Sequence, residues 1–89
     1  MTKTEARDIA LAGFNHIAGN ADLISALLDQ AGADVAALRE MAARPEFLVF
    51  VLDFLMESDE RLLDFTANAG LAPQRVQMAR GVLGGFDAF

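Results

Sequence analysis

PEFLVFVLDFLM (residues 45–56) is the most apolar stretch of the sequence, and its place in the middle of the chain decides the fold. Its only charged residues are Glu46 and Asp53, so a helix over this stretch is apolar around most of its circumference. The stretch is well short of the ~20 apolar residues that span a bilayer. We therefore predict a central helix that is wrapped by the other helices of a small domain.

A helical wheel divides the circumference of this central helix into two parts. At about 100° per residue, Glu46, Asp53 and Glu57 fall within an arc of about 40° and form a narrow polar stripe. Large apolar side chains, each contributing ~1.5–3 kcal/mol when buried, cover the rest: Phe47, Leu48, Val51, Leu52, Phe54 and Leu55. Phe50 lies beside the polar stripe. Either a loop or the C-terminal tail covers it, or it is an exposed anchor for a partner.

The rest of the chain also has the composition and periodicity of helices. Capping residues and glycine or proline stops predict six helices, at residues 4–18, 21–31, 35–44, 45–56, 59–69 and 73–84. We therefore predict an all-α fold, a compact six-helix orthogonal bundle. Residues 1–84 form a single helical domain, and residues 85–89 form a short C-terminal tail.

A shift of 38 residues, the interval from Gly32 to Gly70, aligns the two halves of the chain. The shift also places the N-cap residue Asn20 on Ser58. Core positions coincide in the same way, with Ile24, Leu27 and Leu38 falling on Leu62, Phe65 and Val76. The pattern indicates two tandem three-helix units that must pack on each other, since neither buries its apolar face alone. Either a true duplication or the amphipathic pattern that the helices of both halves share accounts for this agreement.

Composition narrows the class of protein and the kind of partner. Of the 89 residues, 54% are hydrophobic, above the ~45–50% usual for a soluble domain, which indicates either a shared interface or simply many alanines. The net charge of −6 disfavours binding to nucleic acid and to anionic membranes. The first apolar run, residues 9–12, is too short for a signal peptide, so we expect a cytoplasmic protein.

Two motifs carry a resemblance to a known family. P-x-F-L-x-x-V-L-D-F-L at residues 45–55 and A-G-L-x-P at residues 69–73 resemble a short domain family of unknown function found in alphaproteobacteria. The resemblance covers residues 6–83. The family has Asp-Pro before its second and fourth helices, where this sequence has Asn20-Ala21 and Arg44-Pro45. The resemblance implies a compact all-helical domain and no catalytic residues.

Candidate catalytic and metal-binding residues are few. His16 is the only histidine and there is no cysteine, so neither a zinc site nor a thiolate nucleophile is expected. ESDE, residues 57–60, is typical of a helix N-cap followed by acids that favour the helix dipole. No serine-nucleophile elbow or phosphate-binding glycine loop is present. We predict that the protein is not an enzyme and holds no cofactor and no metal.

The leading functional hypothesis is a non-enzymatic protein–protein interaction module, acting as a homodimer or as an adaptor. Its predicted surface consists of residues on the central helix and in the tail: Phe50, Glu46, Asp53, Glu57, Phe86 and Phe89. Residues 46–64 are strongly acidic, and residues 65–86 carry two arginines, Arg75 and Arg80, and no acid. This uneven charge suggests steering of self-association or of a basic partner.

Two alternatives belong to other classes. Residues 73–84 carry Gln74, Arg75, Gln77 and Arg80, which suggests a DNA-associated regulator, although two arginines release few counterions. An enclosed pocket lined by Phe14, Phe47 and Phe54 would instead be the sign of a carrier for a small apolar ligand.

Overall fold

The computed structural model describes residues 1–42 and 44–84, and within them the chain is all α-helical, as predicted. The helices are α1 (Lys3–Ala18), α2 (Ala21–Ala31), α3 (Val35–Met41), α4 (Pro45–Met56), α5 (Asp59–Ala69) and α6 (Pro73–Gly84). Two boundaries differ from the prediction: α1 begins at Lys3 rather than at residue 4, and α3 ends at Met41 rather than near Arg44. Arg44 precedes proline and has the extended conformation (φ −95°, ψ 138°), so the chain leaves the helix before it.

The 38-residue shift is visible in the helix boundaries. α2 and α5 begin and end 38 residues apart, and so do the C-terminal ends of α1 and α4 and the first residues of α3 and α6. The side chains of Asn20 and Ser58 accept hydrogen bonds from backbone N–H groups of α2 and α5. Gly32 and Gly70 end these helices with φ of 63° and 67°, the left-handed conformation that glycine favours. We call α1–α3 the first unit and α4–α6 the second unit.

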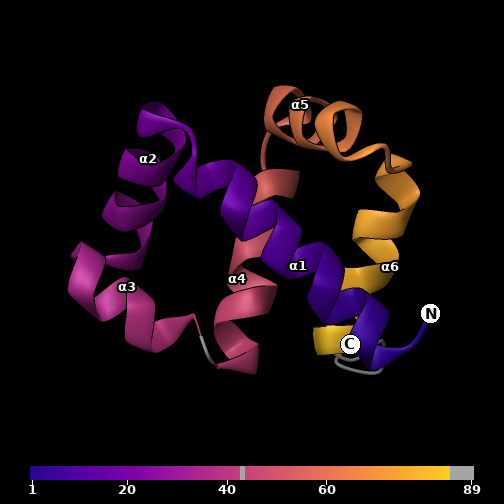
Figure 1. Ribbon diagram of the computed structural model, residues 1–89, viewed down its shortest axis with the longest axis horizontal. Coiled ribbons are helices and arrows are strands. Elements are labelled where there is room, and N and C mark those ends of the chain that lie inside the picture. The colour runs from indigo at the N-terminus through magenta and orange to yellow at the C-terminus, as the bar shows by residue number, and fades with distance from the viewer. Residues whose placement is uncertain (43, 85–89) are drawn as a thin grey trace.

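The first helices of the two units cross at the centre of the molecule (Figure 1). α2 and α3 lie on one side of this crossing, and α5 and α6 lie on the other. α4 packs closely on α1, α5 and α6, and α1 also packs on α2 and α6. None of the helices in the part of the chain that the structure describes has the length and apolar character to cross a membrane.

The apolar face predicted for α4 is the centre of the core. All six residues assigned to that face are buried: Phe47, Leu48, Val51, Leu52, Phe54 and Leu55. Phe54 also lies under the guanidinium of Arg61, which is 4.1 Å from the ring centroid. The Nη1 of Arg61 donates a hydrogen bond to the carbonyl oxygen of Phe54 (3.2 Å), which ties α5 to the end of α4. The central stretch is thus buried by helices of both units.

Gly13 allows α1 and α4 to approach closely where they cross. A Cβ at this position would lie 2.8 Å from Cδ1 of Leu55, a fully buried side chain that has little room to move. We expect Gly13→Ala to lower the free energy of unfolding by about 1–3 kcal/mol. Urea denaturation would measure this loss.

Gly19→Ala is the matched control for Gly13→Ala. A Cβ on Gly19 meets only the backbone oxygens of Asn15 and His16, at 3.5 and 3.7 Å, and the residue has an ordinary right-handed conformation. We expect this variant to keep the urea midpoint of the wild type. Equal losses in the two variants would contradict the close contact at the crossing.

His16 carries a buried polar atom without a partner. Its ring packs against Phe65, with 5.6 Å between the ring centroids, and its Nε2 forms no hydrogen bond within the described residues. Because an unsatisfied buried polar group is costly, we expect His16→Phe to stabilise the protein by about 1 kcal/mol. This gain corresponds to a rise of about 4–8 °C in Tm, measured by circular dichroism. A lower Tm would mean that His16 finds a partner in solution.

Candidate functional site: a groove between α2–α3 and α4

The two units differ in how their third helices pack. α6 lies against both α1 and α4, where it buries Val76, Ala79 and Gly81. Among the closely packed helix pairs of the described chain, none includes α3, the shortest helix. α3 buries only Leu38, so the place that α6 fills in the second unit is only partly filled in the first unit.

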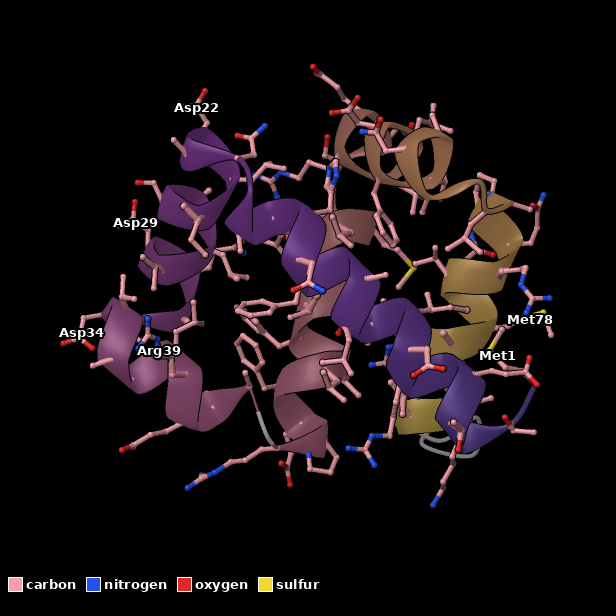
Figure 2. The ribbon with its side chains drawn as sticks, viewed as in Figure 1. Met1, Asp22, Asp29, Asp34, Arg39 and Met78 are labelled. Atoms are coloured by element: carbon pink, nitrogen blue, oxygen red, sulfur yellow. The ribbon has the colours of Figure 1, made fainter. Side chains whose placement is uncertain are left out.

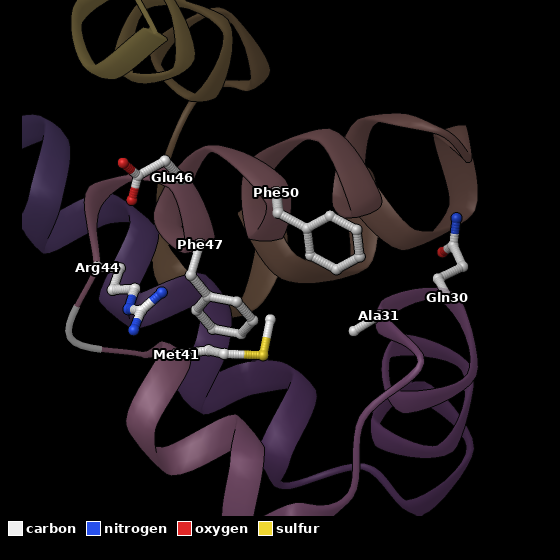
Figure 3. A pocket seen from close by; sticks show the side chains of 7 residues that line it. All are labelled: Gln30, Ala31, Met41, Arg44, Glu46, Phe47 and Phe50. Atoms are coloured by element: carbon white, nitrogen blue, oxygen red, sulfur yellow. The ribbon is translucent and has the colours of Figure 1, made fainter.

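The space left by α3 is a groove of about 650 Å³ between the α2–α3 side and α4. Ala31 and Met41, the last residues of α2 and α3, form one wall, and Phe47 and Phe50 of α4 form the other. Figure 3 shows these four side chains directed toward one another across the groove. The middle of the groove is thus apolar, and it lies between the first and second units.

Aromatic packing holds the α4 wall in place. The rings of Phe47 and Phe50 stack with centroids 6.1 Å apart and an interplanar angle of 25°. Phe14 of α1 packs edge-on against Phe47, with centroids 5.6 Å apart and an angle of 79°. Phe47 is buried, whereas Phe50 is only partly buried and lines the groove. Phe50 therefore presents a positioned apolar surface to any molecule that enters the groove.

Polar side chains mark the two ends of the groove. Arg44 and Glu46 lie at the end where α4 begins, and Gln30 lies at the opposite end (Figure 3). The Nε2 of Gln30 donates to both carboxylate oxygens of Glu57, at 3.2 and 3.0 Å. Glu57 also forms an ion pair with Arg61, at 3.6 Å. An apolar centre with a polar rim is the usual anatomy of a protein-binding surface.

The structure brings together part of the surface predicted from the sequence. Phe50 and Glu46 line the groove, and Glu57 closes its far end through Gln30. Asp53 lies outside the groove lining and pairs with Arg80 of α6, at 3.0 Å. The two tail residues of the predicted surface, Phe86 and Phe89, lie outside the described residues.

The sequence reasoning missed the wall that faces α4. Ala31, Met41 and the end residues Gln30 and Arg44 line the groove but were not predicted as site residues. The sequence feature that could have pointed to them is the difference in length between α3 and α6, the third helices of the two units. α3 is the shorter because the proline at position 45 limits how far it can extend. Helix length alone does not reveal which helices face each other.

A family model described as "Protein of unknown function (DUF3572)" matches residues 3–86. The chain belongs to the DUF3572 family. The match covers the whole range in which the two motifs predicted a domain family of unknown function. No curated protein and no solved structure matches this chain.

The arginines of α6 in this DUF3572 domain are engaged with other helices. Arg75 pairs with Glu5 of α1, at 3.4 Å, and Arg80 pairs with Asp53 of α4. These side chains remain partly exposed, but an acid neutralises each of them. The DNA hypothesis relied on the polar side chains of α6, and the acids beside its two arginines lower the positive charge that this helix offers to phosphates.

The groove also differs from the ligand cavity considered for an apolar carrier. That hypothesis required an enclosed pocket lined by Phe14, Phe47 and Phe54. In the described part of the domain, Phe54 is fully buried under Arg61 and Phe14 packs on Phe47, whereas the groove is open and exposes Phe50. The groove is therefore better suited to part of a larger molecule than to an enclosed ligand.

A second concave surface lies where the N-termini of α2 and α5 come together. It is polar and is lined by the caps Asn20 and Ser58, by Arg61, and by Asp22, Glu60 and Asp64. The acids satisfy the positive ends of the two helices and oppose the binding of an anion. No three potential metal ligands come together among the described residues. The groove beside Phe50 is thus the best candidate for a functional site.

Proposed function

We propose that this DUF3572 domain is a non-enzymatic interaction module that binds an amphipathic helix of another protein in the groove between α2–α3 and α4. The observation that carries the proposal is the positioned pair Phe47 and Phe50, which faces an apolar wall across an open groove. Helix-in-groove binding uses such surfaces, with apolar anchors of the bound helix at intervals of three or four residues. A cytoplasmic location stays a prediction.

The dimensions of the groove support a helix of about three turns as its occupant. Glu46 lines one end of the groove, and Glu57 lies just beyond the other end, where it accepts hydrogen bonds from the lining residue Gln30. These two positions are 11 residues apart, which corresponds to about 16 Å of helix. The second unit supplies an internal precedent, since α6 is a helix of 12 residues packed against the same central pair. A bound helix would complete the first unit as α6 completes the second.

Selection from a displayed library of three-turn helices tests this proposal. The full chain is the target, and each selected helix is measured against wild type and against Phe50→Asp by isothermal titration calorimetry. We expect the binders to carry two large apolar residues three or four positions apart and to lose affinity for Phe50→Asp. Binders that retain full affinity for Phe50→Asp would show that the groove is not the binding site.

Leu63→Asp is the matched control for this selection. Leu63 is a large apolar residue of α5 that is 55% exposed and outside the groove lining. We expect Leu63→Asp to bind the selected helices as wild type does.

Light scattering over a hundredfold range of concentration tests whether a second copy of this chain occupies the groove. A wild-type dimer that Phe50→Asp abolishes would assign the groove to a second copy of this chain and overturn the proposal.

A further inference from the structure

The charges around the groove point to a basic partner. We infer that the helix bound there is cationic, with lysine or arginine flanking its apolar anchors at both ends. This inference rests on the proposed function and specifies the chemistry of the partner. Its basis is the distribution of acids at the ends of the groove and along the neighbouring helices.

The α4 wall places one carboxylate at each end of the groove. Glu46 is exposed in the first turn of α4, and none of the ion pairs formed within the described residues involves it. Glu57 lies just beyond the other end, where it accepts hydrogen bonds from Gln30 and pairs with Arg61 at 3.6 Å, and its side chain stays half-exposed. Three turns of helix separate the two acids, and they lie within about 20° on the α4 wheel. A helix lying along the groove therefore meets an acid near each of its ends.

The opposite wall adds negative potential. Ala31 is the last residue of α2, so the negative end of that helix dipole faces the groove. The last turn of α2 holds Asp29 and no basic residue that would neutralise it. Arg44 is the one cation among the described lining residues, and Glu46, two residues away, offsets it. These two lining charges cancel, so the negative potential on this side of the groove comes from the end of α2 and from Asp29.

The outer flank of the first unit extends this negative field. Figure 2 shows Asp22, Asp29 and Asp34 projecting outward along α2 and the start of α3. The whole chain carries a net charge of −6. Complementary charge of this kind accelerates the encounter with a cationic partner and repels an acidic one. Long-range charge and groove-end charge thus favour the same class of helix.

A pair of matched peptides tests the inference. Both keep the apolar anchors of the best selected helix, and their flanking positions carry either lysine or glutamate. We expect the lysine peptide to bind about 10-fold more tightly at low salt. Because the Debye length is ~10 Å at 0.1 M salt and ~3 Å at 1 M, the two affinities should converge at high salt.

Glu46→Lys and Asp8→Lys separate the local charge from the net charge. Both raise the charge of the chain by two, but Asp8 is an exposed residue of α1 outside the groove lining. We expect Glu46→Lys to reduce the preference for the lysine peptide severalfold and Asp8→Lys to leave most of it. Equal affinity of the two peptides for wild type at low salt would overturn the inference but keep the groove as a helix site. Full binding of either peptide to Phe50→Asp would overturn the proposed function and the inference together.

Discussion

Phe54→Ala should remove a large share of the protein's free energy of unfolding. Phe54 is among the largest fully buried side chains, 1% exposed, and it lies at the end of α4 where α5 begins to pack. Truncation of a buried Phe costs about 3–5 kcal/mol, because apolar contacts are lost and a cavity remains. Domains are stable by about 5–15 kcal/mol, and a chain of 89 residues has a modest core. Urea denaturation followed by circular dichroism would measure the loss.

Arg61→Met distinguishes the apolar contribution of Phe54 from its contact with the cation. The substitution keeps an apolar side chain of similar length and removes the guanidinium, 4.1 Å from the ring centroid, together with its hydrogen bond to the Phe54 carbonyl. We expect a loss of about 0.5–2 kcal/mol, well below that of Phe54→Ala. Equal losses in the two variants would mean that the cation, rather than apolar burial, holds α5 to α4.

Phe50→Asp should weaken binding of a partner helix on the order of 100-fold while the domain stays folded. Phe50 is the partly buried ring of the groove, and a central aromatic anchor contributes about 2–4 kcal/mol to binding. Aspartate removes this apolar surface and adds a charge one turn from Glu46. Since Phe50 lies outside the fully buried core, we expect a smaller loss of stability than for Phe54→Ala. Calorimetric titration and Tm, measured on the same sample, give both quantities.

Phe50→Leu is the control that retains an apolar side chain. We expect it to keep most of the affinity and nearly the wild-type Tm, because leucine still packs against Phe47. If Phe50→Asp lowers Tm as far as Phe54→Ala does, Phe50 is a core residue and its loss of binding reports unfolding. If Phe50→Leu binds no better than Phe50→Asp while both stay folded, the anchor requires an aromatic ring.

Local signals in the sequence were sufficient to predict where the helices lie and which face of α4 is buried. Asn20 and Ser58 cap the helices that the sequence assigned to them, since a capping side chain bonds to N–H groups only two or three residues away. The wheel at residues 45–56 identified the buried face of α4, because the helical period alone decides which side chains share a face. The 38-residue shift followed from the same local signals.

The groove depended on contacts between distant parts of the chain. Met41 and Phe47 are close in sequence, but whether α3 covers α4 depends on how α1, α2 and α6 occupy the centre. The ion pairs of α6 also join distant parts of the chain, since Arg75 and Glu5 are 70 residues apart. A charge count along the sequence found arginines without nearby acids in this part of the chain, whereas packing against α1 and α4 brings an acid beside each of them.

Caps, stops and periodicity act over a few residues, so the sequence was enough to predict the six helices, most of their ends, the buried face of α4 and the order of the two units. The packing of the helices, in contrast, sets how far α6 fills one side of the central crossing and how far α3 leaves a groove on the other side. The physical reason is that a groove is the space between surfaces, and its width depends on how several helices pack at once. For the same reason Phe50, beside the polar stripe in the sequence, became part of a binding surface only when Ala31 and Met41 came to face it.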